Sequence, residues 1–343
     1  MFQIAKVVVL GVALFGAHAS GSAAHQGSHP TSQHHQGSHA HAPIGVTGDH
    51  LLSNGEWMLS YRRMDMTMAG NRDGTRSMDL EEILRSGSGR YSVAPVRMQM
   101  AMHMVGLMYA PSKRATFMMM VPWVKNRMDL VTHMGETFTT GSSDLGDLKI
   151  SVLLPLNEYT VTNVGFTFPS GGLNHRDVTP MGRTVLPYAM QTGSGSYALS
   201  GAVTHKRRSG QRSWGGQASA IVRTNDNREN YRLGNQLQAT AWIAREFGDI
   251  ASLSIRGIYR AWGAIDGEDP RYTLALANNL MPTVDPRLRS GRSLGIAVGG
   301  SFRWTNGHRI AVEFTRSVWQ DLEGPQLETD RVLQVGGQLV FPN

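Results

Sequence analysis

Polar and apolar residues alternate along much of this chain, in segments of about ten residues. In one of them, Ser252, Ser254 and Arg256 share one face, while Leu253 and Ile255 share the other. This alternation is typical of β-strands, whose successive side chains point to opposite faces. About twelve such segments can be assigned, at 56–68, 97–110, 115–127, 144–156, 159–168, 195–205, 213–223, 234–247, 251–262, 292–304, 308–318 and 331–341.

The breaks between these segments are either very short or long. Residues 157–158, 248–249 and 306–307 are turn-sized, whereas 69–96 and 263–291 are long connections. Outer-membrane barrels combine short periplasmic turns with long extracellular loops in this way. The pattern therefore predicts an all-β, antiparallel transmembrane β-barrel of about twelve strands. Within the first long loop, residues 77–85 have a helical pattern and predict a short helix at one mouth of the barrel.

The N-terminal residues predict export. Lys6, an apolar run at 7–16 and the small residues after it indicate a cleaved secretory signal over 1–24. No later stretch offers about 18 consecutive apolar residues, so a membrane crossing would need strands. We therefore expect a monomer in the outer membrane of a Gram-negative bacterium, in contact with lipid and inserted by the barrel-assembly machinery. A soluble β-sandwich or a lipocalin-like barrel gives similar alternation and remains the alternative.

Residues 25–54 separate the signal from the barrel, which we place at 55–343. Residues 25–43 contain almost no large apolar side chains that could be buried, so we expect a flexible arm. Neutral imidazoles bind Cu(II), Zn(II) and Ni(II), so the arm is a candidate metal-capturing segment, with a polar spacer as the alternative. Its histidines are His25, His29, His34, His35, His39 and His41.

Methionine is concentrated in one part of the chain, since fifteen of the 19 fall between Met58 and Met134. Thioethers are soft ligands that suit Cu(I). A methionine-lined path beside the histidine arm would indicate a copper-binding and copper-tolerance protein. The same side chains could instead face lipid, and the sequence leaves their orientation open. The methionines that share a face within a strand are Met64, Met66 and Met68 in one segment and Met98, Met100, Met102 and Met104 in another.

Charge and candidate catalytic groups narrow the function further. The net charge of +7 comes from arginines scattered among glycine and aromatic residues, a pattern that disfavours nucleic-acid binding. The chain has no cysteine, which excludes thiol catalysis and thiolate metal sites. Histidines outside the arm stand apart from any catalytic triad, so an outer-membrane hydrolase is the least favoured reading and no cofactor is required. We expect four arginines to line the lumen and favour anions, namely Arg62, Arg127, Arg223 and Arg256.

Several short motifs together resemble a known family. Residues 57–62, 70–75, 145–149, 186–195 and 324–330 are similar to the transporter-like outer-membrane barrels of the meta-pathway of phenol degradation family. This resemblance implies a channel or transporter for small, hydrophobic compounds, without catalytic residues. The histidine-rich start and methionine-rich strands also resemble copper-resistance protein B, an exported barrel with a metal-binding N-terminal segment. We therefore expect a channel for a small solute, with copper binding as the alternative.

Overall fold

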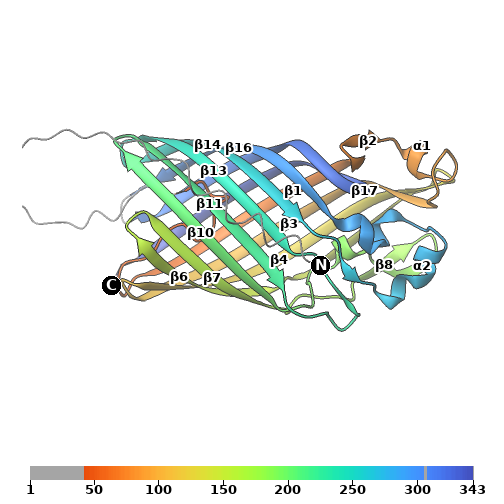
Figure 1. Ribbon diagram of the computed structural model, residues 1–343, viewed down its shortest axis with the longest axis horizontal. Coiled ribbons are helices and arrows are strands. Elements are labelled where there is room, and N and C mark those ends of the chain that lie inside the picture. The colour runs from red at the N-terminus through yellow and green to blue at the C-terminus, as the bar shows by residue number, and fades with distance from the viewer. Residues whose placement is uncertain (1–41, 305–306, 343) are drawn as a thin grey trace, which may run out of the picture. The chain divides into compact units, whose positions relative to one another are not determined.

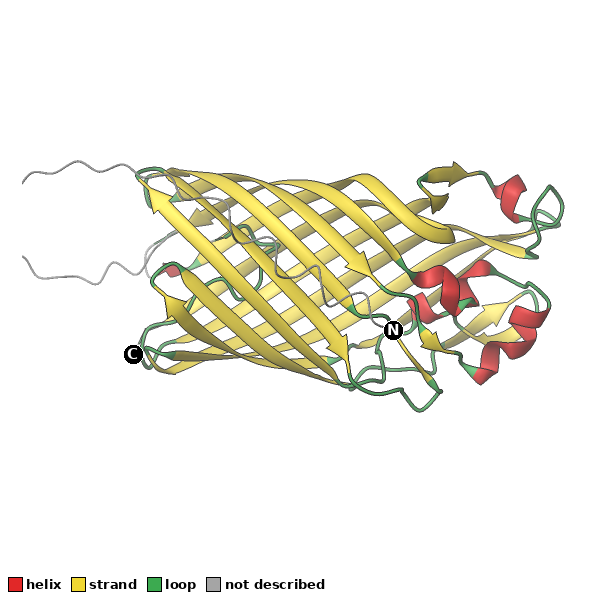
Figure 2. Ribbon diagram, in the orientation of Figure 1, coloured by secondary structure: helices red, strands yellow, loops and turns green. Residues whose placement is uncertain are grey.

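The computed structural model describes residues 42–304 and 307–342, and strands make up most of them (Figure 2). The predicted secretory signal and the six histidines of the predicted arm lie outside these residues. None of the described helices is long and apolar enough to cross a membrane.

The strands of the barrel form one closed antiparallel sheet (Figure 1). The ring closes where the first strand pairs with the last. Two further strands extend the sheet, β2 (Arg76–Met78) beside β1 and β5 (Thr137–Leu145) beside β4. In order around the ring the strands are β1 (Trp57–Gly74), β3 (Val93–Ser112), β4 (Ala115–Thr132), β6 (Leu148–Asn157), β7 (Thr160–Phe168), β10 (Ala198–Ser209), β11 (Arg212–Arg223), β13 (Gln236–Phe247), β14 (Ala251–Trp262), β16 (Gly291–Arg303) and β17 (Arg309–Phe341).

Strand β17 passes along the barrel twice. Its first half, as far as Leu322, pairs with β16, and its second half, from Leu322 to Phe341, pairs with β1. A closed ring in which all neighbours are antiparallel needs an even number of passes, because directions must alternate around it. The eleven strand elements of the ring thus make twelve passes when β17 is counted twice, in agreement with the sequence pattern.

The two ends of the barrel differ, as the loop lengths predict. Short turns gather at the end that carries the C-terminus, and the helices gather at the other (Figure 1). The predicted helix at 77–85 is present but shorter. Further short helices, which the sequence pattern did not predict, lie within 270–289. The small elements are α1 (Leu80–Ile83), β8 (Arg176–Thr179), β9 (Gly182–Val185), η1 (Tyr188–Met190), β12 (Tyr231–Arg232), β15 (Asp266–Gly267), η2 (Pro270–Tyr272), α2 (Thr273–Ala277), η3 (Pro282–Val284) and η4 (Pro286–Arg289).

The inner and outer faces of the barrel have opposite chemistry, as the alternation predicts. Along β14, Ser254 and Arg256 are buried, whereas Leu253 and Ile255 are exposed on the outer face. A continuous exposed apolar belt would drive a soluble protein to associate, but it matches the hydrocarbon of a bilayer. Neighbouring strands continue the belt through Ile243, Ile296, Val298, Val312 and Phe314.

Replacing a belt residue with a charged one should destabilise the barrel in lipid. We expect Ile255→Arg to lower the free energy of unfolding by about 2–4 kcal/mol, because the guanidinium would enter hydrocarbon. Ser219→Arg, which places the same side chain on the inner face of β11, is the matched control and should cost much less. Denaturant unfolding in lipid vesicles measures both; equal losses would show that the outer face does not meet lipid.

Candidate functional site

Residues 42–52 fold into the lumen ahead of β1, and we call them the plug. Ala42, Val46, Asp49 and Leu52 are all buried, with exposed fractions of 2–6%. The expectation of a flexible arm over 25–54 is therefore wrong for its described part. The plug has few apolar side chains that could pack against each other. Side chains on the inner wall of the barrel contact it instead, and the local composition of the plug does not reveal them.

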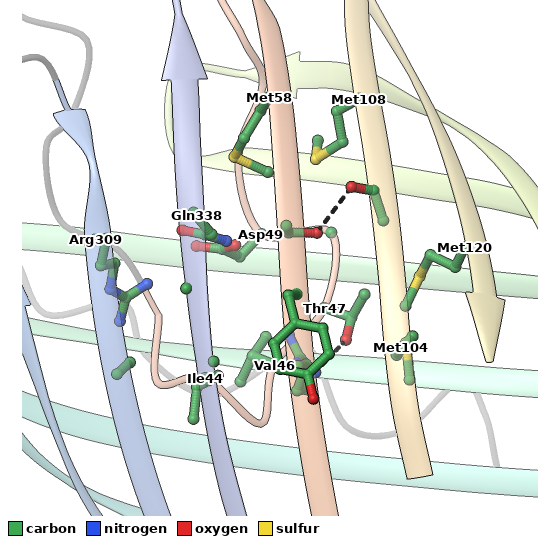
Figure 3. Close-up of a pocket in the computed structure, with 18 of the residues that line it drawn as sticks. Ile44, Val46, Thr47, Asp49, Met58, Met104, Met108, Met120, Arg309 and Gln338 are labelled. Atoms are coloured by element: carbon green, nitrogen blue, oxygen red, sulfur yellow. Dashed lines mark hydrogen bonds between the residues drawn. The ribbon is translucent and has the colours of Figure 1, made fainter. Parts of the chain in front are cut away.

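Polar side chains of the wall hold the backbone of the plug. Arg309 donates to the Ala42 carbonyl at 3.0 Å, and the Gln217 amide donates to the Thr47 carbonyl at 2.9 Å. Arg62 donates to the Thr47 hydroxyl at 3.1 Å. Figure 3 shows Thr47 beside β1, with Arg309 on a strand at the opposite side of the view. These contacts come from three separate strands, so the plug is fixed across the width of the lumen.

The base of the plug, at Asp49 and Leu52, packs against the inner wall at the end of the barrel that carries the short turns. The acid Asp49 accepts from the Ala42 amide at 3.0 Å and lies 3.9 Å from the Lys206 ammonium. Leu52 packs against an apolar cluster that includes Met58 and Met108, both drawn in Figure 3. The base of the plug thus occupies the lumen at that end.

A buried ion pair lies against the tip of the plug. Arg256 Nε donates to Glu313 Oε2 at 3.0 Å, and each side chain is only 1% exposed. Arg256 also donates to the Thr240 hydroxyl at 3.3 Å. A Cβ at Gly45 would lie 2.0 Å from Arg256 Nη2 and 2.3 Å from Glu313 Oε1. Any side chain at this position would therefore have to displace the ion pair or move the plug.

The methionine side chains point into the lumen, which answers the question that the sequence leaves open. Buried Met58 establishes the parity of the inner face of β1, and the exposed Leu59 and Tyr61 take the outer face. Asp65 is on the outer face as well, paired with Arg63 at 2.8 Å. The interpretation that these methionines face lipid is therefore wrong. The inward-facing set comprises Met64, Met66 and Met68 on β1 and Met98, Met100, Met102 and Met104 on β3.

These methionines form one continuous wall. Met64 lies opposite Met102, and Met66 lies opposite Met100. Directly opposed residues of antiparallel strands have Cβ atoms about 4.5–5.5 Å apart, so their thioethers can touch. Among the described residues, no three histidine or acidic side chains gather into a metal-binding group. The thioethers are thus the soft ligands that the described lumen brings together.

A cavity of about 490 Å³ lies at the tip of the plug. Met64 and Met66 line one side of it, while Lys149 and Arg260 reach it from β6 and β14. Arg260 Nε donates to the Gln238 side chain at 2.9 Å. Lys149 makes no hydrogen bond or ion pair with another described residue. The cavity therefore has an apolar, polarisable side and a cationic side.

Basic side chains outnumber acidic ones on the inner wall of the described barrel. The expected lumen residues Arg62, Arg223 and Arg256 do face inward. Arg127 does not, because its strand parity places it outside, 3.6 Å from Asp129. Lys149 and Arg260 also face the lumen without having been predicted to, although the alternation in their strands could have identified them. The inner wall and plug carry Arg62, Lys149, Lys206, Arg223, Arg256, Arg260, Arg303 and Arg309 against Asp49, Glu246 and Glu313.

One histidine lies near a hydroxyl and a carboxylate. His175 Nε2 is 2.9 Å from the Thr192 hydroxyl and 4.0 Å from Asp144 Oδ2. Both contacts use the same ring nitrogen, whereas a catalytic relay uses one nitrogen toward the nucleophile and the other toward the acid. This arrangement gives no support to the hydrolase alternative.

The fold is similar to that of solved outer-membrane channels. The COG4313 outer membrane channel from Pseudomonas putida F1 aligns over 86% of this chain and 99% of its own, with a TM-score of 0.58 and 12% identity. The P. putida toluene transporter TodX aligns over 85% of this chain and 91% of its own, with a TM-score of 0.44 and 10% identity. At 12% identity, the similarity to the COG4313 channel shows the barrel fold alone. No family model and no curated protein matches this chain, so the two family resemblances stay predictions.

The inward orientation of the methionines can be checked by thiol labelling, because the chain has no cysteine of its own. In lipid vesicles, Met66→Cys should react with a small, charged methanethiosulfonate, since it lines the central cavity. The matched variant Leu59→Cys should resist the charged reagent, because a thiol in hydrocarbon does not form the reactive thiolate. The reverse pattern would show that the faces are exchanged.

Proposed function

We propose that this chain is an outer-membrane channel that carries a small organic solute and favours anions. The central cavity supports this proposal most directly, because methionines line one side and the unpaired Lys149 ammonium lines another. The apolar belt and the alternation of short turns with long loops support a location in the outer membrane. A polar interior enclosed by that belt is suited to passage and needs no chemistry.

Electrostatics supports the preference for anions. Charged side chains that line a pore set its selectivity, and they act strongly where little water screens them. Arg256 is neutralised by Glu313, whereas among the described residues Lys149 and Arg260 form no ion pair with an acidic side chain. An anion that enters the cavity therefore meets uncompensated positive charge.

The plug must move before a solute can pass, and Gly45 offers a way to displace it. A leucine there cannot coexist with the Arg256–Glu313 pair, so Gly45→Leu should push the tip of the plug out of its seat. We expect its mean conductance in planar bilayers to rise several-fold above that of the unmodified chain. Gly257→Leu, where a Cβ meets nothing within 4 Å, is the matched control and should leave conductance unchanged.

The same opened channel allows its ion selectivity to be measured. In the Gly45→Leu background, replacing Lys149 and Arg260 with glutamine should move the anion-to-cation permeability ratio several-fold toward one. Reversal potentials in a salt gradient give this ratio, and the outward-facing Arg127→Gln should leave it unchanged. A Gly45→Leu channel with no anion preference would contradict the proposal.

A second candidate function is the binding of a soft metal ion such as Cu(I). The observation that favours it is the opposition of Met64 to Met102 and of Met66 to Met100 on the inner face. Thioethers bind soft, monovalent ions without needing an acidic ligand. The basic side chains of the same cavity oppose this function, because they repel a cation.

Metal titration separates the two functions. If the methionine wall binds Cu(I), the double variant Met66→Leu and Met100→Leu should weaken binding by the full-length chain at least about tenfold, because two soft ligands are lost. Met119→Leu, which changes an outward-facing methionine that is 38% exposed, is the control. Competition with a chromogenic Cu(I) chelator measures the affinity. Equal affinities in both variants would remove the methionine wall from any metal function.

A further inference from the structure

The loops at the helical end of the barrel enclose two adjoining hollows above the central cavity. Their volumes are about 100 and 190 Å³, and both are lined by Trp262, Arg289 and Gln326. A cavity of about 150 Å³ holds a benzene ring, so there is room here for a small organic molecule. Trp262 also lines the central cavity, so the three spaces follow one another along the lumen.

Arg289, the last residue of η4, is a partly buried cation without a counter-ion. It makes no hydrogen bond or ion pair with another described residue, and no acidic side chain lines either hollow. Burial lowers the pKa of its guanidinium to about 10, so the group keeps its charge at neutral pH. Its neighbour Arg287 is different, since that side chain is 81% exposed and pairs with Asp285 at 2.8 Å.

A second polar group in the smaller hollow also has no partner. Thr283 is 4% exposed, and its hydroxyl makes no hydrogen bond within the described residues. A buried hydroxyl left unpaired costs free energy, so an acceptor at this position would stabilise it. Thr283 lines the same hollow as Arg289. Two donors of independent origin therefore point to one anionic ligand.

The rest of the smaller hollow is apolar and soft. Met68, Met98 and Met128 come together there from three adjacent strands. Met98 and Met128 are each 1% exposed, and Trp262 adds an aromatic surface. Methionine adapts its shape to irregular partners and makes favourable contacts with aromatic rings. This surface suits the apolar body of a ligand whose charged end meets Arg289.

We propose that these hollows are a binding site for a small organic carboxylate with an apolar body, held by Arg289 and Thr283 at its charged end and by the methionines at the other. The assignment rests on the proposed channel function, for which it names the class of solute and its first binding site. The charged end selects the ligand, while the methionine surface tolerates different apolar bodies.

Isothermal titration of the full-length chain in detergent with sodium benzoate tests the site. We expect saturable binding that Arg289→Gln weakens about 10- to 100-fold, because a charge-assisted hydrogen bond is lost. Thr283→Val should weaken it several-fold. The exposed Arg287→Gln, from the same short helix, is the matched control and should bind as the unmodified chain does. Gel mobility of unheated samples confirms that each variant is folded.

Two further ligands test the site without any variant. Benzamide has the same ring but no charge and should bind at least about tenfold more weakly than benzoate. Acetate has the charge without the ring and should also bind at least about tenfold more weakly. Equal affinity for benzoate and benzamide, or an unchanged affinity in Arg289→Gln, overturns the proposed site. The conductance of Gly45→Leu tests the channel separately, so failure of the site and failure of the channel are distinguishable.

Discussion

In a lipid bilayer every backbone amide and carbonyl must find a partner within the protein, because hydrocarbon offers none. A closed ring of antiparallel strands meets this requirement, and it makes every other residue face inward. The chemistry of the lumen therefore depends on strand register. A shift of one residue in β1 would exchange inward Met64 and Met66 for the charged pair of Arg63 and Asp65. The methionine wall, the basic inner face and the lipid-facing belt are all consequences of this parity.

The interior of the ring is organised around a pair of opposite charges. Arg256 on β14 and Glu313 on β17 are both buried away from water. Their burial costs desolvation free energy, which their mutual attraction must offset. Loss of either partner would leave the other charge uncompensated, at a cost of about 3–5 kcal/mol. The plug lies against this pair at Gly45, where any side chain would have to displace the pair or the plug. The seat of the plug is thus as rigid as the pair itself.

Much of the fold could be predicted from the alternation of residues, whereas the orientation of the methionines could not. In β14 the two faces differ clearly, since Ser254 and Arg256 alternate with Leu253 and Ile255. In β1, Ser60 and Arg62 share the parity of the methionines, while apolar Leu59 and polar Asp65 share the other. The alternation within one strand shows which residues share a face, but it does not show which face is the inner one. The inner face is determined by pairing with the neighbouring strands.

The plug and the helices at 270–289 escaped prediction for a related reason. Residues 42–52 bury little against each other, and their partners Gln217 and Arg309 are far along the chain. Arg289 was equally invisible, because nothing near it in sequence shows that it lacks a counter-ion. Such residues become recognisable as candidates only when the closed ring brings distant segments together. Local patterns therefore predict the wall of this barrel better than its contents.

The two surfaces of the lumen have different physical roles. A thioether wall is apolar, polarisable and flexible, so it can contact many apolar shapes without strict fit. Lys149, Arg260 and Arg289 add positive charge that acts strongly where water is scarce. A metal cation would have to enter against that charge, whereas an organic anion meets favourable partners on both surfaces. The distribution of charge, rather than the number of methionines, is the reason for proposing solute passage over metal binding in this barrel.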